Sequence, residues 1–239
     1  MAKKQFVITI DTETTNSGRV ADFAAVISDR KGNIHAQCAV LVRGVYDDPE
    51  DTLFTSETSG ELWNSKSLQI RNDRYNAMLD SGIRMMASPA AIAAWLHKAS
   101  KKYNPVLTAY NLAFDLDKCE KTAIDLSMLE RRFCLWAAAV TEFGTSKKYR
   151  QFILQNHFFK SPTDLGNMSY STNAETMARF ITGNPDMEDE PHTALEDIVD
   201  YEIPILNTLW KRKPLSYMIE NSKPYNWRNF QVKDWFSVK

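Results

Sequence analysis

A short apolar run that ends on two acidic residues is the feature that most constrains this chain. Phe6-Val-Ile-Thr-Ile10 is apolar and β-branched, which predicts a strand buried on both faces. Asp11 and Glu13 follow it, and residues two apart on a strand project from the same face. Because neighbouring like charges raise the pKa of each carboxyl group, the pair must either be solvated or share a cation.

Three further segments extend this strand into a sheet. Val20–Ser28 and Ile34–Val42 predict two more strands, joined by short turns into an antiparallel meander. Pro105–Tyr110 predicts a fourth strand, followed by a helix over 113–120. Phe133–Trp136 is either a fifth strand or the beginning of a helix, because alanines follow it. A meander followed by alternating helices and strands predicts an α/β domain with a mixed sheet.

The remaining helices are predicted from residues that begin and end helices. The three pairs of start and stop signals are Ser88-Pro89 to about Ser100, Thr172 with Glu175 to Gly183, and Thr193 with Glu196 to about Trp210. Pro204 lies inside the last helix and is expected to kink it, because proline lacks a backbone N–H and crowds the preceding turn.

Two stretches interrupt this alternation. Residues 44–76 hold a run of acidic side chains with no Lys or Arg before Lys66, which predicts a long acidic insertion with some helix after Ser65. Its charge should repel nucleic acid, so we expect it to pack away from a nucleic-acid groove or to contact a partner. Residues 142–166 are basic and aromatic and are predicted to be irregular. They either track a single strand through its phosphates and bases or form a solvated helix face with a few core rings.

Composition narrows the class of protein. Lys and Arg total 29 and Asp and Glu total 30, so the net charge of −1 argues against a protein held to nucleic acid by bulk charge. A local basic groove is compatible with that balance. The 3 cysteines are an odd number at unrelated spacings, which predicts reduced thiols. No apolar stretch approaches the ~20 residues that span a bilayer. We therefore expect a cytoplasmic protein that does not bind membranes.

Two later motifs carry acidic residues and a histidine. Asn111-Leu-Ala-Phe114-Asp115 follows a predicted strand, with Asn111 at a cap position and Asp115 in the first turn of a helix. By itself, Asp115 could serve only the helix dipole. In His192-Thr-Ala-Leu-Glu-Asp197, Asp197 lies one turn into a helix and can face the sheet, while His192 lies on the preceding loop. A single histidine beside a proline is also common on protein surfaces.

Taken in order, the three motifs resemble those of the DEDDh family of 3′–5′ exonucleases, the DnaQ-like group with a ribonuclease-H-like fold. The matching segments are Asp11-Thr-Glu13-Thr14-Thr15, Asn111-Leu-Ala-Phe114-Asp115 and His192-Thr-Ala194-Leu-Glu-Asp197, the last in the form H-x-A-x-x-D. One departure is Asn16, which stands where the first motif usually continues with glycine. The match spans about Phe6 to Trp210.

This resemblance implies a fold and a domain plan. The fold is a mixed five-stranded sheet, with an antiparallel three-strand meander plus parallel strands, flanked by helices. The domain covers residues 1–210 and carries insertions at about 44–76 and 142–166, and a basic, aromatic extension follows over 211–239.

The resemblance also implies a reaction, the release of nucleoside 5′-monophosphates from the 3′ end of DNA or RNA with two divalent ions, Mg²⁺ or Mn²⁺. Phosphodiester hydrolysis adds negative charge to an anionic group, and hard cations prefer oxygen ligands. Asp11 would bridge both ions, Glu13 and Asp197 would assist one, and Asp115 would act largely through water. His192 would be the general base, since histidine titrates near neutral pH.

The resemblance further implies a set of residues that hold the 3′-terminal nucleotide. These are Thr14, Thr15, Asn111 and Phe114. Phe114 could equally belong to the hydrophobic core.

Two other function classes fit the same residues. The first is a catalytically inactive, nuclease-like module that binds nucleic acid or a polymerase, although all five catalytic positions are filled. The second is a structural protein whose carboxylates hold a stabilising cation, which would raise the melting temperature without nuclease activity. The aromatic tail suggests docking on this domain or on a second subunit, so a homodimer and a polymerase or other replication partner both stay open; its rings are Trp227, Phe230, Trp235 and Phe236.

Overall fold

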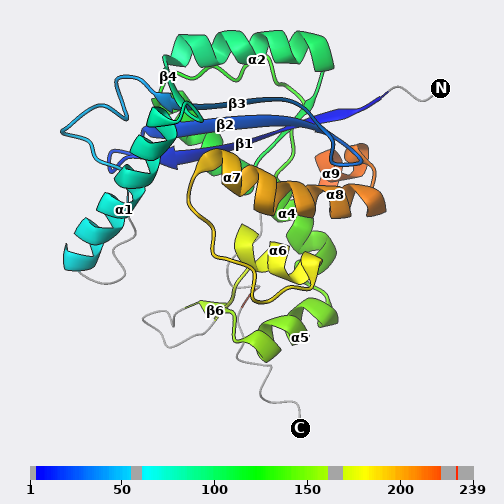
Figure 1. Ribbon diagram of the computed structural model, residues 1–239. Helices are drawn as coiled ribbons and strands as arrows, with labels where there is room; N and C mark the ends of the chain where they lie inside the picture. Colours follow the sequence, from blue (N-terminus) through cyan, green and yellow to red (C-terminus); the bar gives the residue numbers. More distant parts are fainter. Residues whose placement is uncertain (1–3, 55–60, 161–168, 222–229, 231–239) are drawn as a thin grey trace.

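A mixed sheet forms the centre of the molecule (Figure 1). The structure is a computed structural model and describes residues 4–54, 61–160, 169–221 and 230, with side chains left undescribed over 61–67 and at 160. The five strands run in the order β4-β3-β2-β1-β5. They are β1 (Phe6–Thr14), β2 (Val20–Asp29), β3 (Ile34–Val42), β4 (Met85–Ala87) and β5 (Val106–Thr108). β1, β2 and β3 pair antiparallel, β5 pairs parallel to β1, and β4 pairs parallel to β3. This confirms the predicted mixed five-stranded sheet, with its antiparallel three-strand meander and its parallel strands.

Helices cover both faces of this sheet, as Figure 1 shows. They are α1 (Glu61–Asp80), α2 (Pro89–Tyr103), α3 (Leu112–Lys121), α4 (Leu135–Ala139), α5 (Lys147–Asn156), α6 (Ala174–Thr182), α7 (Ala194–Asp197), α8 (Ile203–Arg212) and α9 (Leu215–Asn221). Two π-helical segments, η1 (Val140–Gly144) and η2 (Ile198–Glu202), follow α4 and α7. A short hairpin of β6 (Phe159–Lys160) and β7 (Ser169–Tyr170) lies apart from the main sheet.

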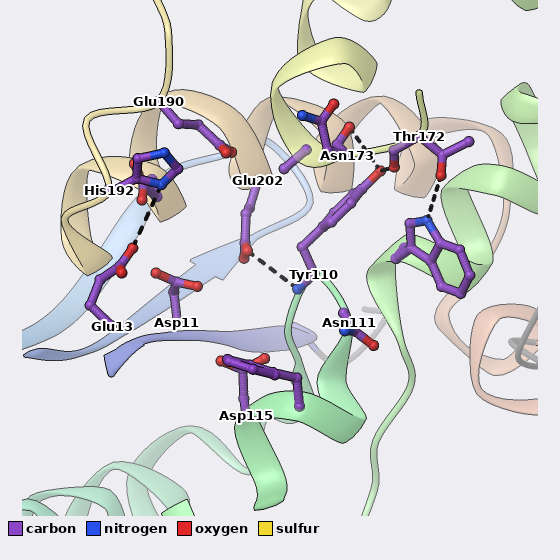
Figure 2. A pocket seen from close by; sticks show the side chains of 14 residues that line it. Asp11, Glu13, Tyr110, Asn111, Asp115, Thr172, Asn173, Glu190, His192 and Glu202 are labelled. Carbon is purple, nitrogen blue, oxygen red and sulfur yellow. Dashed lines mark hydrogen bonds and ion pairs between the residues drawn. The ribbon is translucent and has the colours of Figure 1, made fainter. Parts of the chain in front are cut away.

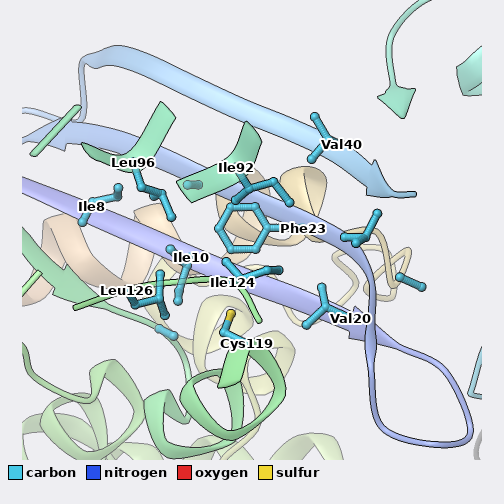
Figure 3. Close-up of a cluster of buried hydrophobic side chains, with 14 of the residues drawn as sticks. Ile8, Ile10, Val20, Phe23, Val40, Ile92, Leu96, Cys119, Ile124 and Leu126 are labelled. Carbon is cyan, nitrogen blue, oxygen red and sulfur yellow. The ribbon is translucent and has the colours of Figure 1, made fainter. Parts of the chain in front are cut away.

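The alternation of β1 divides the core into two layers and thereby aims the acidic residues. Ile8 and Ile10 pack under α2 with Phe23 and Leu96 (Figure 3). Val7 points to the opposite face, where α4, α6 and α8 pack. Each buried side chain of this size stabilises the fold by roughly 1.5–3 kcal/mol. Because Asp11 and Glu13 share the parity of Val7, they project on the α7 side of the sheet.

Two helix starts and one kink differ from the expectation. Asn173, not Thr172, caps α6, and its side chain accepts a hydrogen bond from the Thr176 N–H. Thr193 lies at the start of α7, but its side chain makes no capping hydrogen bond. The last helix is interrupted by η2 rather than at Pro204, which occupies the first turn of α8. Proline is tolerated there because its missing N–H falls at a helix start.

The segment Phe133–Trp136 leads into a helix and forms no strand of the main sheet. Arg132 forms one isolated parallel bridge with Leu107, and α4 begins at Leu135. In the basic, aromatic stretch, α5 is a regular helix that buries Tyr149 and Ile153, so the prediction of irregular structure is wrong there. The alternative of a solvated helix face with core rings describes this helix. Residues 161–168 of the stretch lie outside the described residues.

The acidic insertion packs against the body of its own domain; that it lies away from a nucleic-acid groove or contacts a partner stays a prediction. Asp48 and Asp51 pair with Arg19 at Nη2–Oδ2 distances of 2.8 and 2.7 Å. α1 then crosses the end of the sheet, where the Tyr75 hydroxyl lies 3.0 Å from an Asp22 carboxylate oxygen. The physical reason is charge pairing between segments far apart in the sequence, which composition alone does not reveal.

The described part of the tail docks on its own domain. Leu215 and Met218 of α9 are buried in the same cluster as α4, α6 and α8. Phe230 is also buried there and makes edge contacts with the rings of Trp136 and Tyr170. The tail rings at 227, 235 and 236 lie outside the described residues. Among the described helices, none has the length and apolarity to cross a membrane.

Arg84 provides a test of how the loop before β4 holds α7 against β2. Its side chain is fully buried, and it lies 2.5 Å from Glu196 Oε2 and 3.6 Å from Asp22 Oδ1. Arg84→Ala leaves the buried Asp22 carboxylate without its cation, so we expect a loss of about 3–5 kcal/mol in the free energy of unfolding, measured by urea denaturation. The exposed Arg30→Ala serves as the control, and equal small losses for both variants would contradict this role.

Candidate active site

One cavity at the end of β1 collects the residues of all three motifs (Figure 2). It has a volume of about 430 Å³. β1 contributes the first two carboxylates, the start of α3 the third, and α7 the fourth, while a loop carries the histidine. The motif residues that line it are Asp11, Glu13, Asn111, Phe114, Asp115, His192 and Asp197.

Some oxygens of these carboxylates are buried and lack partners. Asp115 is 2% exposed, and its Oδ1 accepts a hydrogen bond of 2.9 Å from the Thr12 hydroxyl. Among the described residues, Asp11 Oδ2 and Asp197 Oδ1 are buried without a hydrogen-bond partner. A buried, unpaired carboxylate is costly, so the site requires either protons or a cation.

The pKa values of the site show the same strain. Burial, followed by repulsion from Glu202, Asp115 and other carboxylates, raises the pKa of Asp11 well above its ordinary value. Burial raises the pKa of Asp115 to about 7, against the hydrogen bond from Thr12. Burial and the charge of neighbouring carboxylates raise the pKa of Asp197 to about 9. Burial and mutual repulsion therefore favour the protonated forms of these carboxyls, and a bound cation would take the place of those protons.

The donor set fits a hard divalent cation. Glu13, His192 and Asp197 each offer a ligand atom, and these atoms lie within 4.8 Å of one another. Carboxylate oxygens are the donors that Mg²⁺ prefers. The unpartnered oxygens of Asp11 and Asp197 belong to residues that line the same cavity. Glu13, His192 and Asp197 could therefore hold one metal ion together, and Asp11 offers a further carboxylate oxygen in the same cavity.

His192 lies at the mouth of this cavity. Its side chain is 64% exposed, and its Nδ1 lies 4.0 Å from Glu13 Oε1. Its backbone has φ of 53°, the left-handed region that a non-glycine residue occupies at a cost of about 1–3 kcal/mol. The histidine is thus a pocket residue on a constrained loop, and not an isolated surface side chain.

The four residues expected to hold a nucleotide are divided by the structure. Asn111 and Phe114 line the cavity, and the Phe114 ring is 43% exposed with Lys118 Nζ 4.9 Å from its centroid. Thr14 and Thr15 do not line it. The Thr15 hydroxyl instead donates to Asp51 Oδ2 at 2.7 Å. A nucleotide-binding role for these two threonines stays a prediction.

Two further carboxylates line the cavity but belong to none of the three sequence motifs. Glu202 is 3% exposed; its Oε1 accepts a hydrogen bond of 3.2 Å from the Tyr110 N–H, and its Oε2 has no partner among the described residues. Glu190 also lines the cavity, and burial and the charge of Glu175 raise its pKa to about 7. Glu202 follows Asp197 by five residues, which is the wrong spacing for one face of an α-helix, but the π-helical segment η2 brings both to the cavity.

One wall of the cavity is aromatic and fixed by hydrogen bonds. The Tyr110 hydroxyl donates to the Thr172 carbonyl at 2.6 Å, and Trp136 Nε1 lies 3.1 Å from the Thr172 hydroxyl oxygen. Asn173, which caps α6, lies beside them in Figure 2. Only long-range packing between β5, α4 and α6 creates this wall, so the sequence motifs carry no signal for it.

Comparisons with known proteins find similarity in fold alone. No family model matches the chain, and no curated protein matches it. E. coli exonuclease I in complex with a 5cy-dT13 oligonucleotide is similar at 16% identity with a TM-score of 0.46, over 90% of this chain and 42% of that one. A product-bound exonuclease I is similar at 14% identity with a TM-score of 0.45, over 91% and 46%. The chain thus spans less than half the length of these structures, and the likeness assigns no role to any of its residues.

Proposed function

We propose that this protein is a metal-dependent 3′–5′ exonuclease of the DEDDh type, acting on the 3′ end of DNA or RNA and releasing nucleoside 5′-monophosphates. The observation that carries the proposal is the convergence of three sequence-distant motifs on one cavity. Buried carboxylate oxygens there lack partners, and a histidine lies at the mouth. A purely structural ion would not require an exposed imidazole or an open cavity beside it.

The metal ligands in this proposal are Asp11, Glu13, Asp115 and Asp197. Two bound divalent ions, Mg²⁺ or Mn²⁺, would stabilise the attacking and the leaving oxygen of the phosphodiester. Asp11, between the other carboxylates, is the candidate for contact with both ions, Glu13 and Asp197 assist one, and Asp115 acts through water. The hydrogen bond from Thr12 keeps Asp115 in one orientation.

His192 is the proposed general base. Its imidazole is exposed at the cavity mouth, within reach of a water that approaches the scissile phosphate. It takes the proton of that water as the new P–O bond forms, and the 3′ oxygen of the penultimate nucleotide leaves. Asn111 and Phe114 are the proposed contacts of the terminal nucleotide, and the exposed Phe114 ring offers a face for base stacking.

The wider plan of the chain is part of the same proposal. The exonuclease domain covers residues 1–210 with insertions at about 44–76 and 142–166, and 211–239 is an extension. A homodimer and a replication partner both stay predictions, and the mass of the purified protein in solution tests the homodimer directly. The inactive binding module is the competing function, and activity separates the two.

Digestion of 5′-labelled oligonucleotides tests the proposed activity. With Mg²⁺ or Mn²⁺, we expect a ladder that shortens from the 3′ end on DNA or RNA. His192→Ala should lower kcat by roughly 10²–10⁴-fold, the usual contribution of a general base, because no other imidazole lines the cavity. Asp11→Ala should abolish the ladder.

Two outcomes would contradict this assignment. A ladder that survives both substitutions would place the activity elsewhere or in a contaminant. The absence of any ladder with the wild-type protein, on single-stranded and duplex DNA and RNA alike, would favour the binding module. The matched histidine control is His157→Ala, an exposed residue at the C-terminal cap of α5 that does not line the cavity.

The stability of the metal-free protein should fall as the pH rises from about 6 to 9. Asp115 and Asp197, with pKa values of about 7 and about 9 in the fold, keep protons that the unfolded chain has lost above its ordinary value near 4. The folded state then binds more protons than the unfolded chain. The free energy of unfolding is therefore highest at low pH and falls as the pH rises through the pKa values of the folded state. Thermal unfolding in EDTA measures this slope.

Saturating Mg²⁺ or Mn²⁺ should flatten that dependence and raise the melting temperature at high pH, because the cations replace the protons. Asp115→Asn with Asp197→Asn should reduce the slope in EDTA and remove most of the gain from metal, while the raised pKa values of Asp11 and Glu190 account for the slope that remains. A wild-type melting temperature that rises with pH in EDTA, or that ignores metal, would contradict a buried cation site.

A further inference from the structure

Helix α1, which belongs to the acidic insertion, contacts the loop that carries the proposed general base. Arg71, Arg74 and Tyr75 lie three and four residues apart, so they share one face of the helix. Arg71 Nη2 donates to the His192 carbonyl at 3.2 Å, and Arg74 Nη1 donates to the Pro191 carbonyl. The Tyr75 hydroxyl lies 3.3 Å from the same His192 carbonyl. Three side chains of one helix therefore hold two consecutive carbonyls of the loop.

Arg71 also contacts a proposed metal ligand. Its Nη2 donates to Glu13 Oε2 at 2.7 Å, and the two side chains are only 13% and 17% exposed. Its Nη1 donates to the Phe54 carbonyl at 2.5 Å. One guanidinium nitrogen thus joins Glu13 to the backbone of His192. The planar fork of arginine can make these contacts together, whereas a lysine ammonium would meet them as a point charge.

The loop needs such an anchor because of its own conformation. The left-handed φ of His192 is unfavourable for a residue with a side chain, so contacts must hold it. At the far side, the Ala194 N–H donates to Asp22 Oδ2 at 3.0 Å, and the Tyr75 hydroxyl approaches the same oxygen. The loop is therefore fixed on both sides of His192, once by β2 and once by α1.

We propose that Arg71 is a positioning residue for the general base, and that α1 is thereby a working part of the active site. The guanidinium orients the His192 backbone relative to Glu13. The imidazole is thereby held within reach of a water that would lie beside the metal ligands. This inference rests on the proposed function for its catalytic consequence. The anchoring of the loop by α1 follows from the observed contacts and does not depend on the proposed function.

Amide hydrogen exchange tests the anchoring without any activity. Arg71→Met keeps the apolar stem of the side chain and removes its donors, so we expect exchange of the Thr193 and Ala194 amides to quicken by roughly 10-fold or more. Asp73→Ala, at an exposed position of the same helix, is the control and should leave the exchange unchanged. Unchanged exchange in Arg71→Met would overturn the inference, whether or not the protein is a nuclease.

A double-mutant cycle tests the catalytic consequence. Arg71→Met should lower kcat by about 10–100-fold with KM changed less than about 2-fold, because the loss falls on orientation of the base. In the His192→Ala background the same substitution should cost almost nothing further, since the group it orients is absent. Arg71→Lys should recover only part of the loss.

Independent, multiplicative losses in that cycle would overturn the positioning role, because they would show that Arg71 acts on stability or on the metal ligands alone. Failure of the proposed function has a different signature. The wild-type protein would then yield no ladder on any substrate, while the exchange measurement would still decide whether Arg71 anchors the loop.

Discussion

Repulsion among buried carboxylates at the end of β1 is the interaction on which the rest of this structure depends. Asp11 lies among these carboxylates, and both Glu202 and Asp115 raise its pKa in addition to burial. Like charges in a medium of low dielectric cannot remain close without protons or a cation. The surrounding fold must therefore supply enough packing energy to hold them together, and the two hydrophobic layers of the sheet do so.

Three segments outside the sheet complete the arrangement. The π-helical segment η2 places Glu202 beside Asp197 in the cavity. The start of α3 aims Asp115 at β1, with Thr12 as its hydrogen-bond donor. α1 supplies the guanidinium of Arg71, a cation paired with Glu13 at the edge of the cluster. The site thus combines carboxylates on β1 with the loop of His192, which α1 contacts.

Much of the architecture could be predicted from local sequence, because its signals are local. The β-branched runs predicted β1, β2 and β3, and the Ser88-Pro89 start predicted α2. The motif residues of the cavity could be predicted because each follows a recognisable strand or precedes a helix. Their assignment as ligands and base stays a prediction until activity is measured.

The remaining features depend on contacts between distant residues. The composition of the insertion is acidic, so it gave no sign that one of its few basic residues, Arg71, pairs with Glu13, 58 positions away. Thr15 lies at the expected position of its motif, but its hydroxyl donates a hydrogen bond to Asp51. Glu202 has the wrong spacing for an α-helix and was missed because a π-helical turn has no clear sequence signal. Such features follow from tertiary packing and not from periodicity.

The most direct test of the central claim is a crystal structure of the protein with Mn²⁺ and a nucleoside 5′-monophosphate, examined by anomalous scattering. The account predicts two metal peaks roughly 3.5–4 Å apart in the cavity, both within coordination distance of Asp11, with the phosphate beside them. A cavity without a metal peak, or a peak that contacts none of the carboxylates Asp11, Glu13, Asp115 and Asp197, would contradict it.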